Sequence, residues 1–155
     1  MLKQLKRPAV YAFLIATAAL STAVRAATLP AKVTDALTNS KYVYIATLRK
    51  SGTLGKPAEI WFLYHQGAVY VASPPTTHRV RRIKAGRTQA TIAVGKPDGP
   101  SFTATGAIVN DPTVQQLMLE TYANKYSDRW SQFADKFRSG FKDGSRVLVR
   151  YTPKE

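Results

Sequence analysis

The chain has 155 residues, 23 Lys and Arg against 9 Asp and Glu, and a formal net charge of +14 at pH 7. It contains no Cys, which excludes disulfides, thiol chemistry and a lipoprotein attachment site. Such an excess of positive charge suits an anionic ligand, a nucleic acid or an anionic membrane surface, and charge alone does not choose among them.

The first residues have the pattern of a secretory signal peptide. Lys3, Lys6 and Arg7 precede an apolar stretch at 9–22, and Val24-Arg25-Ala26 places small residues where a signal peptidase reads them. We expect residues 1–26 to be cleaved after export to the periplasm or beyond, with an uncleaved membrane anchor as the alternative. The mature chain would have no stable membrane span. Residues 27–155 are enough for one domain, not two.

The rest of the chain alternates β-branched and aromatic runs with turn residues, a pattern typical of short antiparallel strands. A leading helix is expected at 30–39, and Gln66-Gly67 indicates a tight hairpin. Asp111-Pro112 is typical of a helix start. Aromatic residues from Trp130 to Phe141 recur at the helical period, which predicts a second late helix whose aromatic residues pack in the core. The expected strands are 42–48, 59–64, 68–73, 89–94, 101–110 and 146–151.

This order of elements predicts a fold that is mainly β with α. The expected order is three strands, one helix, two strands, two helices and a closing strand. Short antiparallel strands with one crossover helix and a late helical pair favour a six-stranded barrel-like sheet.

The segment 76–87 is the strongest candidate for a binding site. If it forms a helix entered at Thr76 or Thr77, its apolar residues at 80 and 83 face the core, Arg79 and Arg82 share one flank, and Arg81 faces away. Hydroxyl residues at the helix start, its free amides and two guanidinium groups would suit a phosphate. A solvated basic helix is the alternative.

No motif for hydrolysis or nucleotide binding is present. The sequence lacks HExxH, GxSxG, a Walker motif and a dinucleotide glycine motif, and its two histidines lie on opposite sides of an expected strand. We therefore predict no metal site and assign no catalytic residue. An enzyme built on this chain would take its chemistry from an organic cofactor.

Several segments together resemble the pyridoxamine 5'-phosphate oxidase-like, flavin-binding split-barrel superfamily. They are Tyr42–Arg49, the turn with Gly52, Trp61–Tyr64, and Ala68–Ser73 with Thr77–Ile83 after it; the similarity extends over roughly 34–151. The resemblance implies a six-stranded antiparallel split β-barrel. It also implies a homodimer with a cofactor groove at the subunit interface.

The resemblance also assigns cofactor-binding positions. In that superfamily a strand-loop-helix segment holds the flavin phosphate, and the matching residues here are Thr77, Arg79 and Arg82, with Thr76 beside them. Thr47 and Arg49 on the first strand and Trp61 on the second would line the remaining groove. An aromatic in the barrel or the dimer interface is the alternative role for Trp61.

The implied function is an exported protein that binds FMN or a related flavin, as a flavin-dependent oxidoreductase of the pyridoxamine 5'-phosphate oxidase-like type. Deazaflavin and haem are other cofactors of the superfamily, and some members bind none. A non-catalytic flavin-, haem- or anion-binding protein is the alternative, because reduced nicotinamide is not expected outside the cytoplasm. A polyanion-binding surface protein would expose aromatic residues between basic ones. The aromatic residues here recur instead at the spacing of the apolar residues that are expected to face the core. We therefore expect no specific nucleic acid partner.

Overall fold

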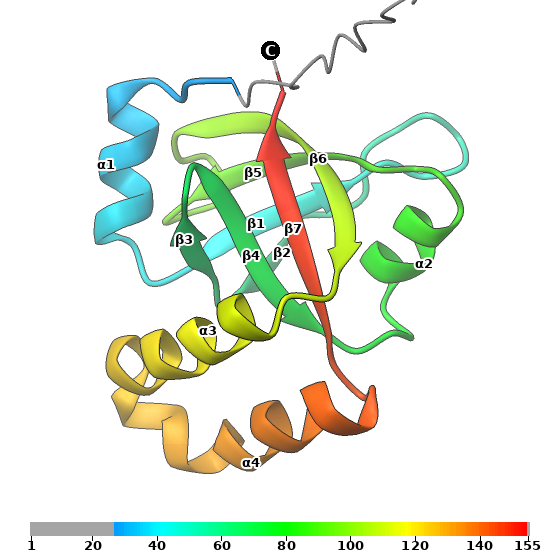
Figure 1. Cartoon of the computed structure of the whole chain (residues 1–155). Coiled ribbons are helices and arrows are strands. Elements are labelled where there is room, and N and C mark those ends of the chain that lie inside the picture. Colours follow the sequence, from blue (N-terminus) through cyan, green and yellow to red (C-terminus); the bar gives the residue numbers. More distant parts are fainter. Residues whose placement is uncertain (1–26, 155) are drawn as a thin grey trace, which may run out of the picture.

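The computed structural model describes residues 27–154 (Figure 1). The expected signal peptide at 1–26 lies outside the described residues. Within them the chain forms four helices and seven strands. In chain order these are α1 (Ala31–Asn39), β1 (Val43–Thr47), β2 (Ala58–Ile60), β3 (Leu63–His65), β4 (Ala68–Ser73), α2 (His78–Lys84), β5 (Gln89–Val94), β6 (Ser101–Val109), α3 (Pro112–Lys125), α4 (Ser127–Asp143) and β7 (Val147–Pro153).

All seven strands belong to one antiparallel sheet in the order β2-β1-β5-β6-β7-β4-β3. The prediction of six strands was wrong, because the run expected at 59–64 is two strands at opposite edges of the sheet. β2 pairs with β1 at one edge, and β3 pairs with β4 at the other. Only Trp61 and Phe62 separate them, so the sheet must curl until its two edges meet. The predicted class, mainly β with α in a split barrel, is confirmed.

Tyr122 of α3 and Tyr126, which lies between α3 and α4, satisfy backbone groups where the two edges meet. The Tyr122 hydroxyl donates to the Trp61 carbonyl oxygen at 2.8 Å. The Tyr126 hydroxyl accepts from the Phe62 amide at 3.0 Å and donates to the Lys41 carbonyl oxygen at 2.6 Å. These bonds replace the strand-to-strand bonds that the break removes, so the buried peptide groups there are not left without partners.

Strand β4 is buried on both faces, which accounts for its unbroken apolar sequence. Val69 and Val71 face the barrel interior, where they join a cluster that includes Val43, Ile92 and Val149. The alternate residues of β4 pack on the other side against α3. That second cluster contains Ala68, Tyr70, Ala72, Val114, Met118, Tyr122, Tyr126 and Leu148, with Trp130, Phe137 and Phe141 of α4 partly buried beside it. Figure 1 shows α3 and α4 lying together below the barrel.

The helix starts and faces agree with the sequence pattern. The Asp111 carboxylate accepts from the Val114 amide at 3.0 Å, which caps α3 as expected. On α2, Val80 is fully buried and Ile83 packs against the barrel cluster, so the predicted apolar face is confirmed. Within residues 27–154, no helix combines the length and apolar character that a bilayer span requires.

Candidate functional site

Six of the seven predicted site residues line a single groove of about 460 Å³. We call it the basic groove. It lies between the end of β1, the loop after β1 and the start of α2, which Figure 1 shows on the same side of the barrel. Its lining residues are Ile45, Thr47, Arg49, Gly55, Lys56, Ala58, Thr76, Thr77, His78, Arg79, Arg81 and Arg82. Five of these are Lys or Arg and none is acidic, so the groove concentrates positive charge.

The loop after β1 folds back to form one wall of the basic groove. The Arg49 amide donates to the Thr53 carbonyl oxygen at 2.8 Å, and the Gly52 amide donates back to the Arg49 carbonyl oxygen at 3.1 Å. Gly52 has φ +82°, a conformation that glycine adopts without strain. The Gly55 amide then donates to the Thr47 carbonyl oxygen at 2.9 Å, which holds the returning chain beside the end of β1.

Arg82 crosses the groove and is fixed by Thr47. Its Nη1 donates to the Thr47 carbonyl oxygen at 3.1 Å and to the Thr47 hydroxyl at 2.7 Å. Gly55 leaves the space for this guanidinium, because a Cβ at that position would lie 2.8 Å from Nη1. Only Nη1 takes part in these bonds, so the other donors of the guanidinium are available to an anion.

Arg79 is the second predicted guanidinium, and its residue is partly buried. Its Nη1 lies 3.5 Å from the Ser73 hydroxyl. Burial lowers the pKa of Arg79 from its ordinary value, while the nearby Tyr151 and Tyr122 act in the opposite direction. A guanidinium keeps its proton despite such a shift, so Arg79 supplies a partly desolvated cation that an anion would stabilise.

Thr76 and Thr77 stand at the entrance to α2. The Thr77 hydroxyl donates to the Pro74 carbonyl oxygen at 2.9 Å, which leaves its lone pairs but not its proton for a ligand. The predicted donation from Thr77 to a phosphate would therefore require this bond to break. Thr76 is exposed and keeps its hydroxyl proton available.

Comparison with solved structures supports the fold. No family model and no curated protein matches the sequence. The chain is similar to a proposed pyridoxamine 5'-phosphate oxidase from Listeria innocua (TM-score 0.57, 12% identity, covering 80% of this chain and 92% of that one). It is also similar to HutZ, the haem storage protein of Vibrio cholerae (TM-score 0.54, 14% identity, 79% and 88% covered), and to an F420 reductase (TM-score 0.54, 18% identity, 82% and 97% covered).

The chain has the pyridoxamine 5'-phosphate oxidase-like split-barrel fold. The resemblance seen in the sequence is thereby confirmed at the level of the fold. A shared fold does not define a shared ligand, so the ligand of this split barrel depends on its own groove residues.

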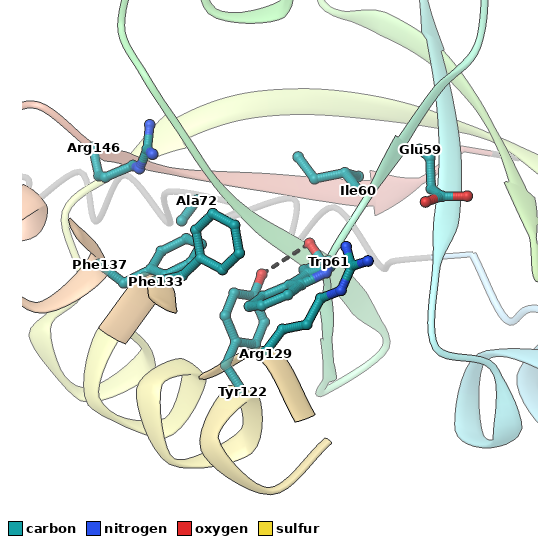
Figure 2. Close-up of a pocket in the computed structure, with 9 residues that line it drawn as sticks. All are labelled: Glu59, Ile60, Trp61, Ala72, Tyr122, Arg129, Phe133, Phe137 and Arg146. Atoms are coloured by element: carbon teal, nitrogen blue, oxygen red, sulfur yellow. Dashed lines mark hydrogen bonds between the residues drawn. The ribbon is translucent and has the colours of Figure 1, made fainter. Parts of the chain in front are cut away.

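Trp61, the seventh predicted residue, does not reach the basic groove. It lies at the junction of β2 and β3 and stacks on Tyr126, with ring centroids 4.1 Å apart and planes 5° apart. Figure 2 shows it instead in a separate cavity beneath the barrel, among aromatic side chains from α3 and α4. Within one copy of this split barrel, Trp61 therefore belongs to the packing of the helical pair.

Six groove residues were not predicted from the sequence, and three of these have ionisable side chains. Lys56 comes from the loop after β1, whose folding back is not visible in its composition. His78 and Arg81 lie on the exposed side of α2 and contact each other, with Arg81 Nη2 3.2 Å from His78 Nδ1. Arg81 was expected to face away from the site, but its exposed side chain borders the groove. Within residues 27–154, no three His, Asp or Glu side chains gather as a metal site would require.

Proposed function

We propose that the basic groove binds the phosphate of FMN or a related flavin, and that this chain is a flavin-binding split-barrel protein. The observation that carries the proposal is the convergence of Thr47, Arg49, Thr76–Thr77, Arg79 and Arg82 on one groove without an acidic neighbour. Within residues 27–154, none of the groove's cations takes part in a salt bridge. Their charge is therefore available to a ligand rather than cancelled by the protein.

The residues present fit a phosphate monoester. Arg82 is held in place by Thr47, and Arg79 is partly desolvated, so both would form charge-assisted bonds to phosphate oxygens at low entropic cost. Thr76 would donate from the groove's edge. Ile45 and Ala58 give the same groove an apolar wall against which a flat ring could lie. A bound flavin would supply electron-transfer chemistry, and these residues would bind and orient it.

Two roles fit such a site: a flavin-dependent oxidoreductase and a non-catalytic carrier of a flavin, deazaflavin or haem. The absorbance spectrum of protein purified from its own compartment identifies the ligand, and a turnover assay then separates the two roles. Bands of a flavin support the proposal, whereas a Soret band would assign the site to haem. Turnover would then be tested with a reduced nicotinamide or deazaflavin as electron donor.

The phosphate assignment is tested by titrating FMN and following the quenching of its fluorescence. Arg79→Gln and Arg82→Gln should each weaken binding by roughly ten- to a hundredfold, the effect of losing one charge-assisted hydrogen bond. Lys84→Gln is the matched control, because Lys84 is an exposed cation on the same helix outside the groove. All measurements need the same salt concentration, since a basic protein attracts any anion. Equal weakening in all three variants would mean that the attraction is diffuse.

Export and dimerisation belong to the same proposal. We propose that the protein is exported, that its mature N-terminus is Ala27, and that two copies pair with the groove near their interface. Intact-mass measurement of exported protein that still carries residues 1–26 would contradict cleavage. Light scattering that gives a monomer at micromolar concentration would contradict the pairing but not the groove.

A further inference from the structure

A second cavity, separate from the basic groove, lies between the sheet and the helical pair (Figure 2). Its volume is about 260 Å³, and it shares no lining residue with the groove. Residues of β2, β4, α3 and α4, Trp61 from the break between β2 and β3, and the residue before β7 form its walls. They are Glu59, Ile60, Trp61, Ala72, Tyr122, Arg129, Phe133, Phe137 and Arg146.

The walls are mostly aromatic rings held at fixed angles to one another. Phe133 meets Trp61 edge-on at a centroid distance of 5.5 Å, and Phe137 is roughly parallel to it at 5.9 Å. Tyr122 meets Trp61 edge-on at 5.6 Å. Figure 2 shows these rings gathered around one space, with Ile60 and Ala72 on the sheet side. Such walls suit an aromatic guest, which can adopt the same edge-on and stacked contacts.

Arg146 places a guanidinium on the lining of this mostly apolar cavity. Its Nε is buried and has no hydrogen-bond partner within residues 27–154. Two contacts position the Arg146 side chain. Its guanidinium carbon lies 5.5 Å from the Phe137 ring centre, and Gly140 leaves space for its Cγ. A Cβ at Gly140 would lie 2.4 Å from that Cγ. No hydrogen bond of the Arg146 side chain is seen within residues 27–154, so its guanidinium can donate to an acceptor placed in the cavity.

The remaining charges set the expected charge of that acceptor. Arg129 is a second cation on the cavity lining, and Figure 2 shows it beside Trp61, with Arg146 beyond the phenylalanines. Neither arginine forms a salt bridge within residues 27–154. Glu59 is the one acidic residue of the lining, and its carboxylate accepts from the Tyr44 hydroxyl. Two cations against one carboxylate leave a single positive charge to be matched.

We propose that this cavity binds a small aromatic monocarboxylate. Its ring would lie among Trp61, Phe133 and Phe137, and its carboxylate would accept from the Arg146 guanidinium. An apolar cavity of about 150 Å³ holds benzene, so the larger space here accommodates one or two fused rings. The proposal does not depend on what occupies the basic groove.

Calorimetric titration with 2-naphthoate tests the proposal, with neutral 2-naphthamide as the ligand of matched shape. Saturable binding of 2-naphthoate is expected, and Arg146→Gln should weaken it by about tenfold or more while leaving 2-naphthamide unchanged. Arg138→Gln is the matched control. Arg138 is an exposed cation of α4 that lies over Trp130 and near Asp135, outside the cavity. The Arg138→Gln variant should bind 2-naphthoate as the wild type does.

A second variant and a measurement on the wild type keep the proposal testable if Arg146→Gln misfolds. Ala72→Leu fills the cavity from the sheet side and should remove binding of both ligands. In the wild type, 2-naphthoate should shift the NMR signals of Phe133 and Phe137 but not those of α2. Failure of 2-naphthoate to saturate the wild type below about 1 mM would overturn the proposal. Equal weakening by Arg138→Gln and Arg146→Gln would also overturn it.

Discussion

The Nη1 of Arg82 donates to both the carbonyl and the hydroxyl oxygen of Thr47, which lies 35 positions earlier in the chain. This pair joins the crossover helix to the end of the first strand. Thr47 is itself buried, so the contact holds the guanidinium at a fixed place in the basic groove. A cation held in this way has less conformational freedom to lose when an anion arrives.

Gly55→Ala should weaken FMN binding without changing the charge of the protein. The added methyl group would lie 2.8 Å from Arg82 Nη1 and 3.4 Å from the Thr47 carbonyl oxygen, so the guanidinium must move away from Thr47. We expect roughly tenfold weaker binding in the fluorescence titration, since part of one charge-assisted contact is lost. Ser51→Ala, an exposed change in the same loop, should bind as the wild type does. Unchanged binding by Gly55→Ala would show that Arg82 is not held where the phosphate lies.

Tyr126→Phe should destabilise the fold by about 1–3 kcal/mol. The change removes the acceptor of the buried Phe62 amide and the donor to the Lys41 carbonyl oxygen, while the stacked ring remains. Urea unfolding should show a lower midpoint at an unchanged slope. Tyr42→Phe is the control, because its half-buried ring also stacks on Tyr126 but no hydrogen bond of its hydroxyl is seen within residues 27–154. Equal stability of the two variants would contradict the role given to Tyr126.

Tyr151→Phe should have the opposite effect and stabilise the protein by about 1 kcal/mol. Tyr151 is fully buried in the barrel, and its hydroxyl has no hydrogen-bond partner within residues 27–154. Burial raises its pKa to about 12, as expected for a phenol away from water. Removing the hydroxyl removes that desolvation cost. A loss of stability in the same urea experiment would reveal an acceptor or a bound water at this hydroxyl.

Lys125 should make the stability depend on pH. Its ammonium lies 3.4 Å from the Phe62 ring centre, and burial lowers the pKa of Lys125 to about 8. Its ordinary value is 10.5, so between these values the unfolded state binds more protons and the free energy of unfolding rises with pH. From about pH 7.5 to 9.5 we expect a rise of about 1 kcal/mol, reduced from the full linkage value because the side chain is partly exposed.

The matching experiment is urea unfolding of Lys125→Met across the same pH range. The rise should disappear in this variant, because the group that binds the extra proton in the unfolded state is gone. Lys142→Met, which removes an exposed cation of α4, should keep the rise. Persistence of the full rise in Lys125→Met would assign the linkage to another group.

The sequence predicted features that depend on local pattern and missed those that depend on distant partners. Val80 and Ile83 are one turn apart, so their shared face could be inferred directly. The break at Trp61-Phe62 could not, because both residues favour strands and the break is stabilised by Tyr126, 64 positions after Phe62.

The same distinction holds in the basic groove. Thr76, Thr77, Arg79 and Arg82 could be grouped because they share one short helix and its entrance. Lys56 enters only through a loop that folds back on β1, and the long, exposed side chain of Arg81 borders the groove although its helical position predicted that it faces away. Trp61 was predicted to line the groove because of the strand expected at 59–64. Its actual contacts are set by the packing of α4.

The last strand lies in the middle of the sheet, and this has a consequence for synthesis. β7 pairs with β6 on one side and β4 on the other, so without it the sheet is two unconnected pieces. A nascent chain cannot close the barrel until residues 147–153 have left the ribosome. The split barrel would thus remain open until its final strand has been synthesised, however early the other strands emerge.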